Sequence, residues 1–328
     1  MQGDWLVAAD DRTGALETAA ELAGPGRPVR VTVGVAHLDA VVDLGTRAGD
    51  AEAADAAVRA LPHARWVAHK IDSTLRGHWP AELAGRGRTL MVPAWPAMGR
   101  TCTDGVVHVH GAPVAAVRDR LPAAMLLPGV DALDAWLVAG DGIAAVDVPD
   151  TATLHAVAAA VARHAAANGD DLLLAGPAGA VGALHLARFG GSPAPPPPVD
   201  VASAGPALVV CGSATEVSVE QVRRLRAARP DVDVGIAPPA DGPLDPAVAA
   251  GLAADVRHRW SHLAVAVLIG GDTAAAVLGT APRLVGGHAA PGMPWSLDEH
   301  GGGPLVVTKA GGFGGPDALV DLFTSHTV

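Results

Sequence analysis

The stretch LVVCGSATEVSVEQVRRLRA, residues 208–227, decides the fold class. Its first four residues are apolar and predict a buried strand, a Gly-Ser turn follows, and a helix is predicted from residue 216 onward. The same order of apolar run, small-residue turn and helix recurs along the chain. Apolar strands that alternate with helices are typical of parallel sheets covered on both faces. We therefore predict an α/β fold with mostly parallel sheets.

Short apolar runs predict further strands on either side of this stretch. They lie at residues 5–9, 29–35, 66–71, 90–94, 143–148 and 172–175, and then at 232–236, 264–269 and 305–308. Further helices are predicted at residues 14–22, 153–166, 178–186, 246–260, 273–278 and 316–323. Ligands of such sheets bind outside the carboxyl ends of the strands, so the residues that follow each run are the candidates for function.

The segment GGSPAPPPPVD, residues 190–200, marks a boundary. Four consecutive prolines fit neither a helix nor a central strand, so they predict an extended, semi-rigid linker. Because each side has its own series of strands, we predict two domains, at residues 1–189 and 201–328, each with a mostly parallel sheet flanked by helices. A surface loop within one domain is the alternative interpretation.

Composition argues against several classes of function. The formal net charge is −11 and no basic cluster is visible, which disfavours nucleic-acid binding. Cys102 and Cys211 lie far apart without CxxC spacing, so we expect neither a disulfide framework nor a cysteine zinc site. The chain opens with no basic leader, and no apolar run approaches the roughly 20 residues of a membrane helix. We expect a soluble cytoplasmic protein that binds no membrane.

Adjacent carboxylates, Asp10 and Asp11, follow the first predicted strand and precede a helix. Such a pair can orient hydroxyls, hold a metal or accept a proton. Capping the helix is the ordinary role of an aspartate at this place, and Asp11 is the better candidate for it. Helix capping by Asp11 leaves the presence of Asp10 unexplained.

Lys70, Asp72, Ser73 and Arg76 close another apolar run, in the string KIDSTLRG. Burying an unpaired ammonium group costs roughly several kcal/mol. We therefore expect Lys70 to have an anionic partner. A Lys–Asp pair that stabilises a turn is the structural interpretation. The functional interpretation is a carboxylate site in which Arg76 makes a bidentate contact. Arg100, in a glycine-containing loop, also suits an anion.

Three small-residue turns follow strands in the second predicted domain. A strand, a short turn and a helix N-terminus form an anion site, because free N–H groups and the helix dipole face the ligand. We predict nucleotide phosphates at these turns. The residues assigned to them are Ser213, Gly270, Gly271, Asp272, Thr273, Lys309, Gly311, Gly312 and Gly314. The chain has no GxxxxGKS/T string and no GxGxxG after its first strand, which disfavours P-loop enzymes and dinucleotide dehydrogenases.

Six strings occur here in the order that they have in four-carbon acid sugar kinases, and the chain resembles that family over nearly its whole length. They are ADDRTG (9–14), KIDSTLRG (70–77), PAMGRT (96–101), CGS (211–213), GGDT (270–273) and KAGGFGG (309–315). The family usually has DDLTG, GGET and KSGNFG at three of these places. The resemblance implies an acid-sugar domain, then a nucleotide domain, with the active site in the interdomain cleft. It implies ATP-dependent phosphorylation of a threonate, erythronate or 3-oxo-tetronate.

The resemblance also suggests roles for individual residues. The acid sugar is expected at Asp11, Lys70, Asp72, Ser73, Arg76 and Arg100. The reacting groups are expected at Asp10, Asp11, Asp72 and Arg100. One of the three aspartates would orient or deprotonate the attacking hydroxyl, Mg²⁺ would bridge the phosphates, and Arg100 or Lys309 would neutralise developing charge. We expect the acid sugar and ATP as partners and a homodimer as the assembly to test.

Two functions of other classes remain open. One is a sensor that binds an acid sugar and a nucleotide without catalysis, since a shared fold does not guarantee activity. The other is an aldolase that uses Lys70 as a Schiff base. The aldolase leaves the three glycine turns unexplained, so we rank it last.

Overall fold

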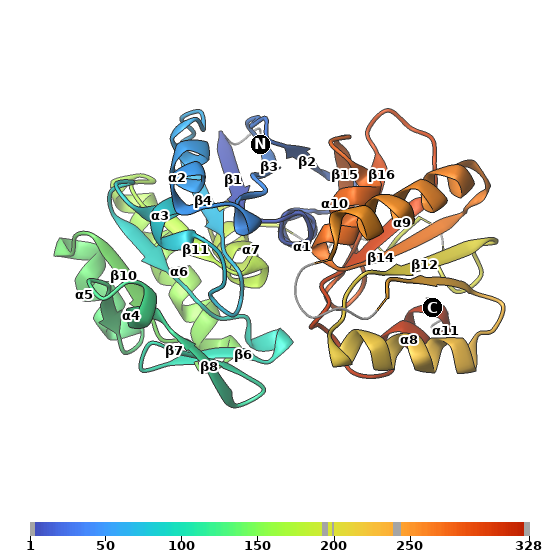
Figure 1. The fold of residues 1–328 in the computed structure, drawn as a ribbon. Helices are drawn as coiled ribbons and strands as arrows, with labels where there is room; N and C mark the ends of the chain where they lie inside the picture. The colour runs from blue at the N-terminus through green and yellow to red at the C-terminus, as the bar shows by residue number, and fades with distance from the viewer. Residues whose placement is uncertain (1–3, 192–195, 199, 239–243, 325–328) are drawn as a thin grey trace. The chain divides into compact units, whose positions relative to one another are not determined.

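The computed structural model describes residues 4–191, 196–198, 200–238 and 244–324. The chain divides into two compact units, Met1–Leu22 with Thr32–Ser192 and Ala23–Val31 with Pro193–Val328. Each contains a sheet with helices beside it (Figure 1). Of the predicted linker 190–200, residues 192–195 and 199 lie outside the described residues, and the domain boundaries derived from it stay a prediction. Within the described ranges, no helix combines the length and the apolar character needed to cross a bilayer.

Seven parallel strands form the main sheet of the first unit. In spatial order they are β3 (Ala40–Asp43), β1 (Trp5–Ala9), β4 (Trp66–Lys70), β11 (Leu173–Gly176), β5 (Thr89–Met91), β10 (Ile143–Val146) and β9 (Met125–Leu127). Ala9 at the end of β1 is in register with Asp43 on one side and with Lys70 on the other. The segments that follow β1, β3 and β4 therefore emerge together at one edge of the sheet.

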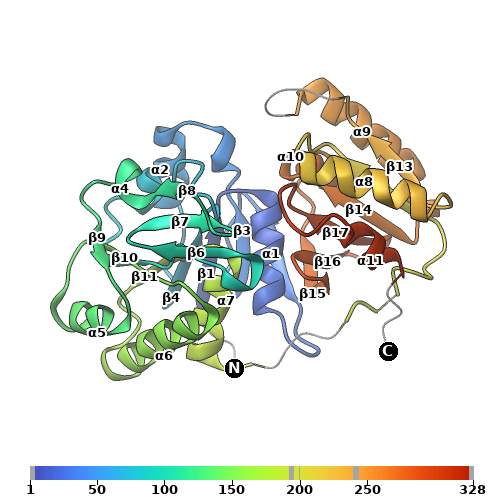
Figure 2. The ribbon, with the colours of Figure 1, turned by 90° about the horizontal axis from the view of Figure 1, so that it is seen from below.

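Helices of the first unit pack in two groups. One group is a series in which each helix contacts the next: α1 (Arg12–Leu22), α7 (Ala178–Phe189), α6 (Thr151–Asn168) and α5 (Val130–Ala139) (Figure 2). The other pairs α2 (Ala51–Arg59) with α3 (Trp79–Leu83). Three short helices lie in the connections: η1 (Thr46–Ala48) between β3 and α2, η2 (Pro96–Met98) after β5, and α4 (Val117–Arg120) before β9.

A small antiparallel sheet completes the first unit. It consists of β6 (Arg100–Thr103), β7 (Val106–Val109) and β8 (Ala112–Ala116). Its first strand follows η2 directly, so the fold places Arg100 at the start of β6.

The second unit has four parallel strands extended by three antiparallel ones. The parallel strands are, in order, β13 (Asp233–Ile236), β12 (Ala207–Cys211), β14 (Val265–Ile269) and β17 (Leu305–Lys309). They are followed by β16 (Met293–Asp298), β15 (Arg283–Ala290) and the first three residues of β2 (Val29–Val33). Pairing with β15 explains why Ala23–Val31 belongs to this unit. Its helices are α8 (Glu216–Ala228), α9 (Pro246–Arg259), η3 (Trp260–His262), α10 (Gly271–Leu278) and α11 (Ala318–Thr324).

The predicted α/β fold is confirmed, and each predicted strand and helix is present with its ends shifted by a few residues. The strand predicted at 29–35 ends at Val33, and the strand predicted at 90–94 covers Thr89–Met91. Other elements were not predicted: β3, β6, β8, β9, β15, β16, η1, η2, η3 and α2–α5. The buried core is mostly aliphatic, as the composition requires, and Val267 and Leu225 are fully buried in the second unit.

Candidate functional site

Asp11 closes the first turn of α1 at the end of β1. Its Oδ1 accepts a hydrogen bond from the Gly14 N–H at 3.1 Å, and its Oδ2 accepts one from the Thr13 hydroxyl at 2.7 Å. Its carbonyl accepts the N–H of Ala15 at 2.9 Å. The capping role expected of Asp11 is therefore confirmed, and it leaves the same carboxylate available to a cation.

Lys70 is that cation. Its Nζ lies 3.0 Å from Asp11 Oδ1 and 3.4 Å from Asp10 Oδ1, and the residue is only 4% exposed. The expected anionic partner is thus confirmed, although it comes from the segment after β1 rather than from Asp72. Burial favours the neutral amine, but the two carboxylates outweigh it and raise the pKa of Lys70, so the ammonium form persists. Gly14 makes room for it, since a Cβ there would lie 1.9 Å from Nζ.

Arg47, on η1, is a member of this site that the sequence did not single out. Its Nε and Nη2 donate to the two oxygens of Asp10, both at 2.8 Å, and Nη2 also lies 2.8 Å from Asp11 Oδ1. It lies 3.6 Å from Asp72 Oδ1, so it joins all three acids. Burial would raise the pKa of Asp11, but Lys70 and Arg47 lower it to about 2.

Asp72 organises the loop that follows β4. Its Oδ2 accepts the backbone N–H of Thr74 at 3.1 Å and Arg76 Nε at 2.9 Å, while its Oδ1 accepts Arg76 Nη2 at 2.7 Å. Burial acts to raise the pKa of Asp72, but these bonds and the Arg47 charge hold it well below its usual range. The bidentate contact predicted for Arg76 is therefore made to Asp72, and its contact with a substrate stays a prediction.

Two more of the predicted residues lie in the same unit. Ser73 is buried in the loop after β4. Arg100, at the start of β6, is 4% exposed. The Arg100 guanidinium donates to the carbonyl of Met98. Burial lowers the pKa of Arg100, and the charge of Asp72 partly opposes this. Arg100 is therefore within electrostatic reach of the cluster.

The three glycine turns of the second unit converge because β12, β14 and β17 are adjacent and parallel. A Cβ on Gly212 would lie 2.2 Å from Thr273 Oγ1, and a Cβ on Gly311 would lie 2.2 Å from Ser213 Oγ. Gly270 donates its N–H to the carbonyl of Lys309 at 2.9 Å. The three turns, at Gly212, Gly270 and Gly311, thus form one surface although they lie far apart in sequence. The binding of a nucleotide at this surface stays a prediction.

Gln221, on α8, holds the loop after β17. Its Nε2 donates to the carbonyls of Phe313 at 3.0 Å and Gly315 at 2.7 Å. Ser218 Oγ donates to the Gly311 carbonyl at 2.8 Å. Lys309 is 1% exposed and its Nζ donates to the Gly311 carbonyl at 3.3 Å. The loop that contains Gly312 and Gly314 is therefore fixed by side chains from two elements.

Among the described residues, no group of three or more His, Cys, Asp and Glu side chains is arranged to hold a metal. Asp272, in the first turn of α10, is a carboxylate at the turns, and its Oδ2 accepts the Leu244 N–H at 3.4 Å. One carboxylate together with phosphate oxygens suits Mg²⁺, which usually keeps several of its waters.

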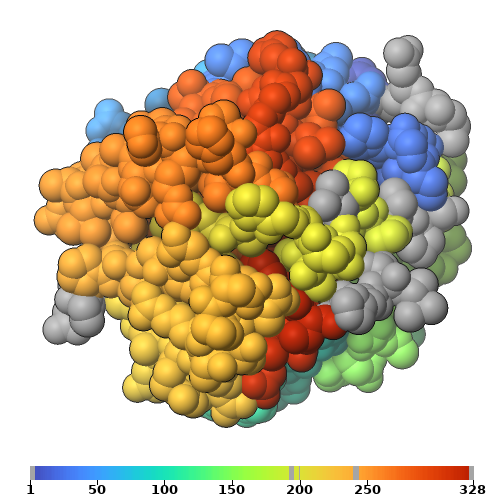
Figure 3. Space-filling model, turned by 90° about the vertical axis from the view of Figure 1, so that its right-hand side faces the viewer, coloured from blue at the N-terminus to red at the C-terminus, as the bar shows by residue number. Residues whose placement is uncertain are grey.

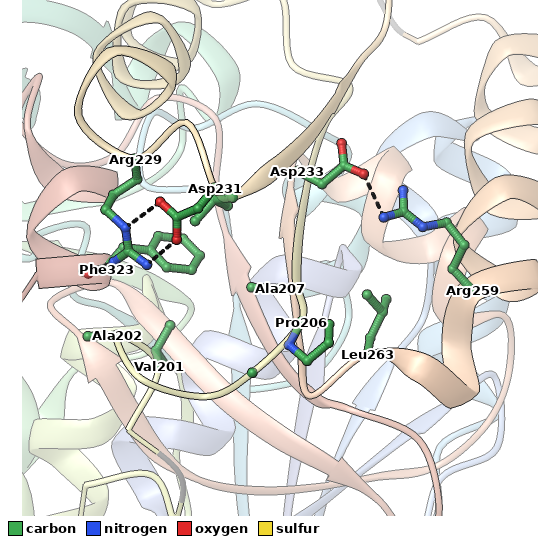
Figure 4. Close-up of a pocket in the computed structure, with 12 residues that line it drawn as sticks. Val201, Ala202, Pro206, Ala207, Arg229, Asp231, Asp233, Arg259, Leu263 and Phe323 are labelled. Carbon is green, nitrogen blue, oxygen red and sulfur yellow. Dashed lines mark hydrogen bonds and ion pairs between the residues drawn. The ribbon is translucent and has the colours of Figure 1, made fainter.

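A separate pocket of about 250 Å³ lies at the amino ends of β12 and β13. Figure 4 shows two ion pairs on its sides, Arg229 with Asp231 and Arg259 with Asp233. It includes none of the residues assigned to the nucleotide. Figure 3 views the second unit from the side on which α8 and α9 form much of the surface.

Comparison with known proteins adds to these observations. Residues 5–121 match the family model described as the sugar-binding N-terminal domain. A D-threonate kinase of Cupriavidus necator is 29% identical, and the alignment covers 98% of both chains. A D-threonate kinase of Salmonella typhimurium is 27% identical over 66% of this chain and 59% of its own.

Two solved structures share the fold over nearly the whole chain. A Salmonella typhimurium protein, provisionally described as a tRNA synthase, has a TM-score of 0.69 at 20% identity and covers 96% of this chain and 98% of its own. A Haemophilus influenzae protein of the DUF1537 family has a TM-score of 0.61 at 21% identity, with 97% and 98% covered. The sugar-binding domain model and the two kinase relatives support a place for this chain in the four-carbon acid sugar kinase family.

Proposed function

We propose that this protein is an ATP-dependent kinase that phosphorylates a hydroxyl of a four-carbon acid sugar of the threonate, erythronate or 3-oxo-tetronate type. The observation that carries the proposal is the convergence of three glycine turns at the ends of β12, β14 and β17. Such a surface suits phosphate groups, because backbone N–H groups and a helix N-terminus are available to them. The D-threonate kinases among the relatives support the choice of acceptor.

The first unit would hold the acid sugar. Lys70 stays charged and buried, and Arg76 and Arg100 add two guanidinium groups within electrostatic reach of Asp72. Guanidinium and ammonium groups bind a carboxylate through charge-assisted hydrogen bonds. Ser73 would contribute a hydroxyl to the same contact, and Asp11 or Asp10 would accept hydrogen bonds from the sugar hydroxyls.

The acceptor hydroxyl would be oriented by one of the three aspartates. Asp11 and Asp72 are held ionised by neighbouring cations, which makes them weak bases and good hydrogen-bond acceptors. Kinases depend mainly on positioning and charge neutralisation, so orientation by a weak base suffices. Asp10, bound by both arms of Arg47, is the third candidate.

The second unit would hold ATP through Ser213, the turn Gly270–Thr273 and the loop 311–314. Mg²⁺ would be shared between phosphate oxygens and Asp272, and when bound it withdraws charge from the transferring group. Lys309 or Arg100 would neutralise charge that develops in transfer. In KAGGFGG, Ala310 and Gly312 stand where the family usually has Ser and Asn, so two polar side chains are missing and the backbone would make more of the contacts.

The aldolase alternative requires a lysine whose pKa is depressed, because only the neutral amine attacks a carbonyl. The carboxylates of Asp11 and Asp10 act in the opposite direction on Lys70. This argues against Schiff-base chemistry at Lys70. No observation of this structure favours a non-catalytic sensor over a kinase.

The proposal is tested by measuring ADP release from the purified protein with Mg²⁺ and ATP. The panel consists of D- and L-threonate, D- and L-erythronate and 3-oxo-tetronates, and a mass increase of one phosphoryl group identifies the product. We expect turnover that depends on at least one of these acids. Nucleotide binding without turnover on any of them would instead support the sensor, and a borohydride-trapped adduct at Lys70 would support the aldolase.

A further inference from the structure

Glu17 is a buried carboxyl in the middle of α1 to which no role has been given so far. It is 4% exposed, and within the described ranges its Oε1 has no hydrogen-bond partner. It lies three residues after Gly14, so the two positions share a helix face. Gly14 is the residue against which Lys70 Nζ packs. Glu17 is therefore on the side of α1 that faces the Lys70 site.

The charged groups that act on Glu17 are those of this cluster. Burial is the largest influence and raises the pKa of Glu17 to about 8. Lys70 and Arg47 oppose the shift, while Asp11 and Asp72 add to it. At neutral pH the side chain is consequently a carboxylic acid, which can donate a hydrogen bond as well as accept one.

Elements that pack on α1 carry other charged groups, and most of these are already paired. Asp43 on β3 is bound by Arg12, and His69 on β4 by Glu82. On α7, Arg188 is bound by Asp170, and His185 stacks among aromatic rings. Further groups are Asp10 at the end of β1, Glu21 on α1 itself and Arg100 on β6, whose pKa an ionised Glu17 raises.

The protonation state of Glu17 sets the net charge of the site. Its cations are Arg47, Lys70, Arg76 and Arg100, and its carboxylates are Asp10, Asp11 and Asp72. Four cations face three carboxylates, so the site carries one net positive charge while Glu17 is neutral and none once it is ionised. An ionised Glu17 would also be a buried charge that repels an incoming anion.

We propose that Glu17 is a binding residue of the acid-sugar site, which as a neutral carboxyl donates a hydrogen bond to the bound acid and by ionising expels it. This inference rests on the proposed function, since it takes an acid-sugar anion as the ligand. Binding of the anion and ionisation of Glu17 are then mutually exclusive. Above the pKa of Glu17, each bound anion must bring one proton with it, and affinity falls about tenfold per pH unit.

Calorimetry tests this linkage. D-threonate and D-erythronate are titrated into the full chain at pH 7 and pH 9, in pairs of buffers with different heats of ionisation. In the wild type we expect Kd to rise roughly tenfold from pH 7 to pH 9, with uptake of close to one proton at the higher pH. Glu17→Gln retains a neutral donor of the same shape, so we expect wild-type affinity at pH 7, no proton uptake and no pH dependence. Glu21→Gln, one turn along α1, is the matched control and should behave as the wild type.

A second measurement does not depend on the ligand. Carbon-13 labelling of glutamate carboxyls and NMR titration of the free protein should show one carboxyl with a midpoint near pH 8 that is missing from Glu17→Gln. A titration of Glu17 near its ordinary value of 4.5 overturns the proposal. The proposal is also overturned if the wild-type affinity and proton uptake do not change with pH, or if Glu17→Gln shows the same pH dependence as the wild type. Either result leaves the proposed function intact. Absence of binding to every acid at both pH values overturns the proposed function and this inference with it.

Discussion

Lys70 Nζ lies 3.0 Å from Asp11 Oδ1, and this contact joins the end of β4 to the cap of α1. The same oxygen accepts the N–H of Gly14 and lies 2.8 Å from Arg47 Nη2. Asp11 Oδ1 therefore caps the first turn of α1 and also forms ion pairs with the buried Lys70 ammonium group and the Arg47 guanidinium group. A change at this point acts on local structure and on the charge of the site together.

Gly14→Ala tests how closely α1 and Lys70 must approach. The added Cβ would lie 1.9 Å from Lys70 Nζ and 2.5 Å from Asp11 Oδ1, so the ammonium group must move. A displacement of this size in a positioned group costs on the order of 10²-fold in rate, and we expect that loss in kcat/KM for the acid sugar. Gly251→Ala, on α9, is the control, because nothing lies within 4 Å of its Cβ. Wild-type kinetics for Gly14→Ala would show that the Lys70–Asp11 contact is not needed.

Most strands could be predicted from the sequence because they are buried on both faces and read as plain apolar runs. β15 could not, because its sequence RLVGGHAA contains two glycines that resemble a turn. The structure explains one of them: a Cβ on Gly286 would lie 2.1 Å from the ring of Trp295 on β16. A glycine that makes room for a partner strand's tryptophan gives the same local signal as a turn.

The site shows a similar division. Lys70 could be predicted, because an ammonium group at the end of an apolar strand requires a partner. Arg47 could not, because its role follows from β3 being the neighbour of β1, and sequence order does not state that adjacency. Glu17 was missed because a glutamate in a helix is ordinary, and only its burial distinguishes it. Residues that lie in a recognisable sequence motif could thus be predicted. Residues that join the site only through tertiary contacts could not.

Arg76→Ala tests the assignment of the acid sugar to the first unit. The Arg76 side chain is 68% exposed and is held in place by Asp72, so it remains accessible to a ligand. We expect its removal to raise KM for the acid sugar far more than KM for ATP. Arg59→Ala, which breaks another exposed Arg–Asp pair on α2, should leave both constants unchanged. If Arg76→Ala leaves both unchanged as well, the substrate assignment is wrong.

Gln221→Leu tests the assignment of the nucleotide to the second unit. It removes the two hydrogen bonds to the Phe313 and Gly315 carbonyls while keeping an apolar side chain of similar size. Each buried bond contributes about 1 kcal/mol, so we expect KM for ATP to rise roughly tenfold to thirtyfold, with KM for the acid sugar little changed. Glu220→Gln, at the exposed neighbouring position, is the control. A change confined to KM for the acid sugar would contradict the proposed location of ATP.

Glu17→Gln should also change how stability depends on pH. The pKa of Glu17 is about 8 in the folded protein and 4.5 ordinarily, so between these values the folded state keeps a proton that the unfolded state has lost. This stabilisation is complete below about pH 4.5 and is lost as pH rises toward 8, at about 1.4 kcal/mol per pH unit and at most about 5 kcal/mol in total. Glutamine does not titrate, so denaturant unfolding should show the variant close to the wild type at pH 5 and about 4 kcal/mol more stable at pH 8.5. Glu21→Gln should follow the wild type, and parallel pH profiles for all three proteins would contradict a protonated Glu17.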